Sequence, residues 1–391
     1  MIDNEVRIHE FQPVWLTVTG EGPFPANPYH VDFTDSNNEP CNFFLLMSEN
    51  GRGKTTILAL LAALMASLGE SQPQEYGVEA LDAGELRVQW DVRVRLSWQG
   101  KAHSIILSIL GGALNDDFIL KPWGEGDLKT YGAKSWHSTG FRRRARNVLE
   151  PIGRGDELIQ ALRATLQDWK GDVATSSRGF AGNDFALPTL LLFSAYRDIP
   201  KVAENRFIAE PDHWAYQPAH SFGAHNPRWL DSLDNLLVWL KWLDQDKASH
   251  DAEGRFGRAR RFVNNHVFCD SPDKYLEGVR TTTLEAIVKN GDSIHRLDRL
   301  SSGEKNLVHL FLRIGAHMTS QTIVLIDEPE VHLHPRWQHR LMRHLREFAR
   351  NTPGVTLIVA THSLDMFRAF GFEVPEEGLR KGGEVIESEM E

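Results

Sequence analysis

Residues 41–56 read CNFFLLMSENGRGKTT, and this stretch decides the fold. Its apolar first half, residues 41–47, is typical of a short buried strand. The strand leads directly into SENGRGKTT, and the next residues, ILALLAALMASL (57–68), indicate a buried helix. A strand, a glycine-rich turn and a helix in this order are the structural context that a phosphate-binding loop requires.

The turn supplies the groups that bind phosphate. Gly51 and Gly53 lack a Cβ atom, so backbone N–H groups can curl around an oxyanion. Lys54 is placed to reach the β- and γ-phosphates as a catalytic residue, and the Thr55 hydroxyl can ligate Mg²⁺. Ser48 stands where the usual pattern has its first glycine, and an ordinary turn before a core helix is the alternative. The predicted nucleotide ligands are Asn50, Gly51, Arg52, Gly53, Lys54, Thr55 and Thr56.

A second apolar strand ends in two acids. Residues 322–326 read TIVLI, and Asp327 and Glu328 follow. In a doubly wound sheet, a buried strand delivers such residues to the carboxyl edge, beside the phosphate loop. We expect Asp327 to hold magnesium and Glu328 to polarise a water for attack on the γ-phosphate. Alone, the two acids could simply be polar residues where a strand leads into a loop. Together with the phosphate loop, they favour an ATPase.

Two further segments extend this site. Residues 355–360 (VTLIVA) predict another buried strand, and His362 follows it at the edge where a catalytic contact with the γ-phosphate or the attacking water is expected. Residues 300–305 (LSSGEK) open an apolar helix, so Ser301, Ser302 and Gly303 can form a second anion site at its N-terminus. A structural histidine and an ordinary helix cap are the respective alternatives.

These four motifs, in this order, resemble the ATP-binding-cassette (ABC) ATPases. ENGRGKTT is similar to their [S/G]-x-N-G-x-G-K-[ST]-[ST] loop, LSSGE to their LSGGE signature, and VLIDEP to their Walker B strand, while His362 falls on their switch histidine. DEPEVHLHP (residues 327–335) resembles a narrower group, related to the overcoming-lysogenisation-defect nucleases, RecF, and the stand-alone ATPases of phage-defence systems such as Septu and retron-Septu.

The resemblance implies an α/β ATPase head, a mixed β-sheet with a P-loop core, that uses ATP and Mg²⁺. It implies a head-to-tail homodimer or higher homo-oligomer, in which Ser301, Ser302 and Gly303 of one copy close over the nucleotide of the other. The motifs lie far apart along the chain, so we expect an inserted helical lobe at about residues 136–279 and a core lobe at about 1–135 and 280–391.

Several positions depart from the cassette pattern. Leu333, His334 and Pro335 replace the usual D-loop, so signalling between subunits is expected to differ. His332 and His334 could mimic a metal pair, but two ligands without a third argue against zinc. The glutamine of the family's Q-loop cannot be placed among Gln72, Gln74, Gln89 and Gln99. Tyr196 and Arg197 follow a buried strand and could reach the nucleotide or form a plain salt bridge.

Two clusters of basic and aromatic residues suggest nucleic-acid contact. One comprises Arg142, Arg143, Arg144 and Arg146 after Phe141; the other comprises Arg255, Arg258, Arg260 and Arg261 with Phe256 and Phe262. Such residues suit phosphate contact and base stacking, although a solvated helix face or a dock for an acidic partner is the alternative. Because few residues follow His362, we expect any nuclease or other toxin that the ATPase regulates to be a separate effector protein.

Composition narrows the class of protein. The net charge of −10 argues against coating nucleic acid by bulk charge, and no apolar run is long enough to cross a membrane. The charged start is unlike a signal peptide, and Cys41 and Cys269 are expected to be reduced thiols in a cytoplasmic protein.

The sequence therefore predicts an ABC-type ATPase that gates an effector in nucleic-acid surveillance or phage defence. Three alternatives remain: a nucleotide-locked scaffold with little turnover, a RecF-like DNA-repair ATPase, and, less favoured, the ATP-binding subunit of a transporter.

Overall fold

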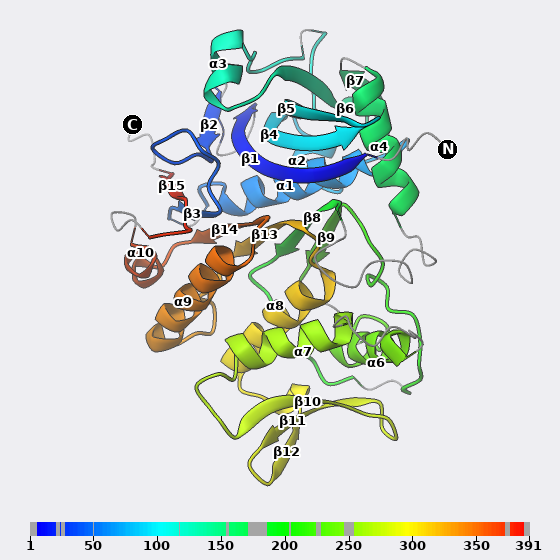
Figure 1. The fold of residues 1–391 in the computed structure, drawn as a ribbon, viewed down its shortest axis with the longest axis vertical. Coiled ribbons are helices and arrows are strands. Elements are labelled where there is room, and N and C mark those ends of the chain that lie inside the picture. The colour runs from blue at the N-terminus through cyan, green and yellow to red at the C-terminus, as the bar shows by residue number, and fades with distance from the viewer. Residues whose placement is uncertain are drawn as a thin grey trace.

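The computed structural model describes residues 6–20, 24, 28–49, 51–116, 118–153, 156–170, 186–202, 205–223, 228–245, 254–371 and 376–386. Asn50, one of the predicted nucleotide ligands, lies outside these residues. Two six-stranded sheets and a three-stranded sheet are stacked along the long axis of the molecule, with helices between and around them (Figure 1).

A parallel sheet at the middle of the molecule carries the phosphate loop. Its strands follow the order β15, β3, β14, β13, β8, β9, and every neighbouring pair is parallel. They span Phe43–Met47 (β3), Pro188–Phe193 (β8), Ala219–Phe222 (β9), Gln321–Asp327 (β13), Val355–Thr361 (β14) and Lys381–Val385 (β15). The central strands are buried on both faces, which is why they read as continuous apolar runs.

Successive residues of these strands pack on opposite faces of the sheet. Phe44 and Leu46 join the core around α1 (Lys54–Leu68), whereas Phe43 and Leu45 join the core around α8 (Ser302–His317). Helices α9 (Pro335–Asn351) and α10 (Leu364–Phe370) complete the second face. Helix α1 lies between the two larger sheets, so it is apolar around most of its circumference (Figure 1).

The other six-stranded sheet is mostly antiparallel and covers α1. Its order is β2, β1, β4, β5, β6, β7, and only the β5–β6 pair is parallel. The strands span Arg7–Thr19 (β1), Tyr29–Asp32 (β2), Arg87–Trp98 (β4), Lys101–Gly112 (β5), Ser135–Ala145 (β6) and Val148–Gly153 (β7). The short helices α2 (Glu79–Asp82) and α3 (Glu125–Thr130) lie in its connections, and α4 (Glu157–Trp169) packs beside it.

The far end of the molecule combines helices with the smallest sheet. Helices α6 (Leu233–Gln245) and α7 (Arg255–His266) pack against α8 and against an antiparallel sheet of β10 (Lys274–Arg280), β11 (Glu285–Asn290) and β12 (Ser293–Arg296). A 3-10 turn, η1 (Leu297–Arg299), leads from this sheet into α8.

The α/β class with a P-loop core is confirmed, but the predicted division into lobes needs correction. Residues 136–279 do not form one helical insertion. Strands β6 and β7 extend the antiparallel sheet, and β8 and β9 belong to the parallel sheet itself. The reason is that β13 is an interior strand, and β8 pairs with its second edge over six residues. Of the helices and strands described in this range, only α6, α7 and β10 lie in the separate end of the molecule (Figure 1).

Within the part of the chain that the structure describes, no helix is both long and apolar enough to cross a bilayer.

Candidate nucleotide-binding site

The phosphate loop curls because two of its glycines adopt conformations that L-residues rarely take. Gly51 has φ 81° and Gly53, which precedes α1, has φ 91°. The loop closes around Lys54, whose Nζ donates to the Ser48 carbonyl at 2.7 Å, to the Ser48 hydroxyl at 3.1 Å and to the Glu49 carbonyl at 2.9 Å. Burial lowers the Lys54 pKa, an effect that neighbouring carboxylates oppose. The ammonium therefore lies inside the loop, where a nucleotide's terminal phosphates would enter.

The Walker-type carboxylate meets this loop across one intervening strand. The Thr55 hydroxyl donates to Oδ2 of Asp327 at 2.8 Å, although β14 separates their strands. Asp327 is buried and burial raises its pKa, while its Oδ1 has no hydrogen-bond partner among the described residues. One hydroxyl and one buried carboxylate with an unused oxygen match the hard oxygen ligands that Mg²⁺ takes in such sites. The residues present therefore fit the ion.

The predicted base and the predicted switch histidine are adjacent. Nδ1 of His362 lies 3.2 Å from Oε1 of Glu328. Glu328 has a left-handed backbone with φ 42°, a conformation that costs a non-glycine residue energy and is often found at functional sites. Its N–H donates to the Ala360 carbonyl at 2.8 Å, which fixes the turn at the end of β13.

A second glutamate, which the motif analysis did not single out, anchors the histidine. Glu330 is buried, and its Oε1 accepts from the Thr361 hydroxyl at 2.5 Å and from the His362 N–H at 3.1 Å. The same oxygen lies 3.3 Å from Nδ1 of His362. The sequence signal was the Glu-x-Glu spacing of Glu328 and Glu330, which alone does not reveal that the second acid turns inward.

Arg197 lies beneath the carboxylates and holds their backbone. Its guanidinium donates to the carbonyls of Asp327 (2.8 Å) and Glu328 (3.0 Å) and to Oδ1 of Asn306 in α8 (2.9 Å). Burial lowers its pKa to about 10, so it remains charged at neutral pH. Tyr196, by contrast, is 73% exposed. Arg197 is therefore a buried brace for the backbone of the two acids, which is neither of the roles, nucleotide contact or plain salt bridge, that the sequence suggested.

The signature-like segment lies at the start of α8, where Ser301 and Ser302 are exposed. Ser301 caps the helix together with Glu304, and the Glu304 carboxylate pairs with Lys274 at 2.6 Å. Gly303 faces the loop after β13, since an added Cβ would lie 3.2 Å from Leu333. Both serines are thus exposed, although the Ser301 hydroxyl already donates to the Glu304 carboxylate at 2.9 Å.

The first basic cluster is largely paired within the antiparallel sheet. Arg142 bonds Glu150 (2.9 Å) and Asp116 (2.8 Å), Arg144 also bonds Glu150, and Arg143 donates to the Gly84 carbonyl. The adjacent Phe141 is buried and cannot stack on a base. Three of the four cations are thus engaged and the ring is buried, whereas Arg146 is exposed, so the cluster offers less to a nucleic acid than its sequence suggested.

The second cluster is mainly structural. Arg255 and Arg258 are buried and donate to the carbonyls of Ala316 (2.7 Å) and Gly315 (2.6 Å), respectively. They therefore satisfy the last carbonyl groups of α8, which lack partners within the helix. Arg260 and Arg261 are exposed, but Phe262 is buried.

Neither a Q-loop glutamine nor a zinc site emerges from the geometry. Gln89 is buried in the antiparallel sheet, where it bonds Asp91 and the backbone at Lys121. Strand β8 is followed instead by Ser194, whose carbonyl accepts from the Arg197 guanidinium at 2.6 Å. Among the residues described, no three His, Cys, Asp or Glu side chains gather as a metal site, so His332 and His334 have no third ligand.

Comparisons with known proteins agree with this geometry. The family described as "AAA domain, putative AbiEii toxin, Type IV TA system" matches residues 171–365. The Retron Vc95 probable ATPase of Vibrio cholerae is 36% identical over 97 residues, 22% of this chain and 18% of that protein. The Retron Ec83 probable ATPase of Escherichia coli is 33% identical over 115 residues, 25% of this chain and 20% of that protein.

UvrABC system proteins also match. The UvrABC system protein A of Staphylococcus epidermidis is 40% identical over 163 residues, covering 40% of this chain and 15% of that protein. The chain thus spans a fifth or less of the length of these curated relatives. Among solved structures, an SMC head bound to the C-winged helix domain of ScpA aligns over 92% of both chains, with 12% identity and a TM-score of 0.42.

Proposed function

We propose that this chain, an ABC/SMC-like ATPase, binds and hydrolyses MgATP, pairs head to tail with a second copy, and thereby regulates a separate effector in nucleic-acid surveillance or phage defence. The observation that carries the proposal is the convergence of Lys54, Thr55, Asp327, Glu328 and His362 from three strands of one sheet. Their donor and acceptor groups match those that phosphoryl transfer to water requires.

Each group has a defined part in the reaction. Lys54 and the α1 N-terminus bind the terminal phosphates, and Glu328 orients and polarises the attacking water. Thr55 and Asp327 would hold Mg²⁺, which when bound neutralises charge on the β- and γ-phosphates. His362, oriented by Glu328 and Glu330, would donate to the γ-phosphate.

The exposed signature segment supports the dimer. Ser301 and Ser302 are exposed at the positive end of a sixteen-residue helix. A second copy in head-to-tail orientation would bring these donors to the γ-phosphate at Lys54. ATP would then lie between two chains.

The role in defence rests on the DEPEVHLHP loop and on the retron relatives, which are named probable ATPases. We place the protein in the cytoplasm, where a nucleic-acid surveillance system would act. The RecF-like resemblance of the DEPEVHLHP loop favours a second candidate, a DNA-repair ATPase. The two differ in what stimulates turnover: an effector protein in the first case and a DNA duplex in the second.

Two variants test the core proposal. We expect Glu328→Gln to lose phosphate release while binding MgATP as the wild type does, because the phosphate loop is unchanged. Lys54→Ala should lose ATP binding itself. Size-exclusion chromatography with light scattering should show an ATP-dependent dimer that is most stable in Glu328→Gln. Negligible turnover by the wild type, with or without effector or DNA, would instead identify a nucleotide-locked scaffold.

A further inference from the structure

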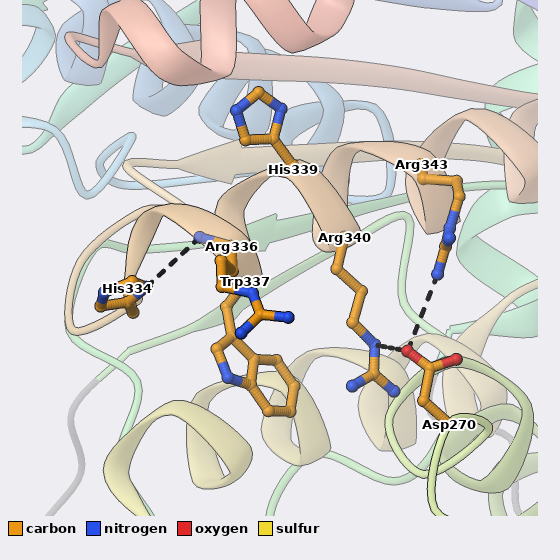
Figure 2. A pocket seen from close by; sticks show the side chains of 7 residues that line it. All are labelled: Asp270, His334, Arg336, Trp337, His339, Arg340 and Arg343. Atoms are coloured by element: carbon orange, nitrogen blue, oxygen red, sulfur yellow. Dashed lines mark hydrogen bonds and ion pairs between the residues drawn. The ribbon is translucent and has the colours of Figure 1, made fainter.

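A basic cavity of about 690 Å³ opens on the surface of the first two turns of α9, apart from the phosphate loop. It is lined by Asp270, His334, Arg336, Trp337, His339, Arg340 and Arg343. Arg336, Arg340 and Arg343 have the i, i+4, i+7 spacing that places side chains on one helix face. Figure 2 shows Trp337, Arg340 and Arg343 leaving the helix on the side of Asp270, with His339 pointing the other way.

One arginine builds the wall of the cavity. Arg340 donates to the Val267 carbonyl at 2.8 Å, lies 3.1 Å from the Asp270 carboxylate, and covers the Trp337 ring at 4.6 Å from its centroid. These contacts connect α9 with the turn after α7, and they hold the indole in place (Figure 2). The cavity is therefore shaped by tertiary packing rather than by mobile surface side chains alone.

Two other arginines remain available to a ligand. The Arg343 side chain is 55% exposed and lies 3.8 Å from Asp270, a carboxylate that already pairs with Arg340. Arg336 is exposed, and no ion pair to its guanidinium is found in the part of the chain described. The cavity is thus lined by three guanidinium groups and one carboxylate, which leaves an excess of positive charge around it.

We propose that this cavity is a second phosphate-binding site, and that it takes a phosphate-bearing nucleotide unit, either a nucleic-acid strand or a free nucleotide. Guanidinium groups bind phosphate in charge-assisted hydrogen bonds. Arg336 and Arg343 are separated by about 10 Å along the helix axis, which suits two phosphates of a chain better than one inorganic phosphate. Trp337, whose ring Arg340 covers in part, adds apolar surface for a base or sugar beside them.

The position of the cavity connects it with the ATP site. His334, at its rim, caps α9 by accepting from the Arg336 N–H at 3.4 Å. The preceding residue, Leu333, packs on Gly303 of the signature segment. A nucleic-acid strand bound in the cavity would therefore lie one loop away from the Ser301–Gly303 segment, which we propose contacts the nucleotide of the partner copy.

Fluorescence anisotropy with Lys54→Ala protein tests the site, because that variant removes competition by the phosphate loop. The probes are a labelled single-stranded DNA 12-mer, its RNA counterpart, a labelled ADP, and a labelled acidic peptide of equal charge. We expect tighter binding of a strand than of ADP, with affinity falling with salt at a logarithmic slope of about −1.4 for two phosphates. Tighter binding of ADP than of a strand would identify the free nucleotide as the ligand.

Paired variants localise the effect. Arg336→Ala with Arg343→Ala should weaken binding by about a hundredfold, roughly tenfold for each lost charge-assisted contact. Arg350→Ala is the matched control, since it is exposed on the same helix but does not line the cavity. Unchanged binding in the double variant, an equal loss in the control, or equal binding of the acidic peptide would overturn the proposal. None of these results depends on ATP hydrolysis.

Discussion

The Glu330 carboxylate accepts a hydrogen bond from the backbone N–H of His362 at 3.1 Å, and the same oxygen lies 3.3 Å from that residue's Nδ1. Glu330 thus fixes both the main chain and the ring of the histidine. With Glu328 on the same Nδ1, the ring is held so that Nε2 remains for another partner. This arrangement makes Glu330 a positioning residue for the proposed reaction.

Replacing Glu330 should separate turnover from binding. We expect Glu330→Gln to lower the ATPase rate constant by about tenfold and Glu330→Ala by more, with the dissociation constant for MgATP nearly unchanged, because hydrogen bonds to a charged acceptor are worth about 1.5–3 kcal/mol. Single-turnover hydrolysis and equilibrium binding measure the two quantities. Glu347→Gln, an acid on α9 away from the site, is the control. Wild-type turnover in Glu330→Ala would refute the assignment.

Arg197 and Asn306 should act as one unit. Their 2.9 Å hydrogen bond connects α8 with the arginine that holds the backbone of Asp327 and Glu328. We expect Arg197→Lys and Asn306→Ala each to reduce ATP-dependent dimerisation and turnover, and the double variant to lose no more than the stronger single variant. A double-mutant cycle on both readouts measures this coupling. Fully additive losses would show that the two residues act independently. Thermal unfolding of each variant checks that the fold is kept.

Arg258 should contribute to stability rather than to ligand binding. It donates to the carbonyls of Gly315 (2.6 Å) and Met318 (3.2 Å) at the end of α8. Arg258→Met would leave these buried acceptors unpaired, at a cost of about 2–4 kcal/mol in the free energy of unfolding. Urea denaturation measures the loss, and Arg261→Met, at an exposed position of the same helix, should change stability by less than about 0.5 kcal/mol. Equal losses in the two variants would contradict the structural role.

Asp91 gives a pH dependence with a defined sign. Its carboxyl is fully buried in the antiparallel sheet, and burial raises its pKa from 3.8 to about 7. Between these values the folded protein keeps a proton that the unfolded chain has lost, so stability falls as the pH rises through this window.

The variant Asp91→Asn removes this titration. We expect the stability of the variant relative to the wild type to increase between pH 5 and pH 8, by on the order of 2 kcal/mol. Chemical denaturation at the two pH values measures the difference. A relative stability that is constant across the window would show that Asp91 does not titrate there.

The sequence predicted those parts of the site that are formed by residues contiguous along the chain. A strand, a glycine-rich turn and a helix are contiguous around Lys54, and the acids of β13 follow their strand directly, so motif and geometry coincide. The roles of Glu330 and Arg197 could not be predicted, because each depends on partners from other strands or helices. Strand β6 begins at Ser135 in a polar stretch whose composition favours a loop, because its parallel pairing with β5 outweighs the local preference.

The basic clusters also show that the role of a side chain depends on partners that the local sequence does not reveal. Arg255 has the sequence pattern of a surface cation, but the carbonyl that it satisfies belongs to Ala316, in another helix. Charge patterning reports which groups could face solvent. It does not report which helix end they will cap instead.

The order of the parallel sheet has a consequence for biosynthesis. Strand β3, which ends in the phosphate loop, hydrogen-bonds only β14 and β15 among the described strands, and these begin at Val355 and Lys381. During translation β3 leaves the ribosome long before either partner strand has been synthesised. Its apolar residues therefore lack their neighbouring strands during that time. A nascent or prematurely terminated chain would therefore lack a competent phosphate loop, and chaperones would be most needed before the last two strands emerge.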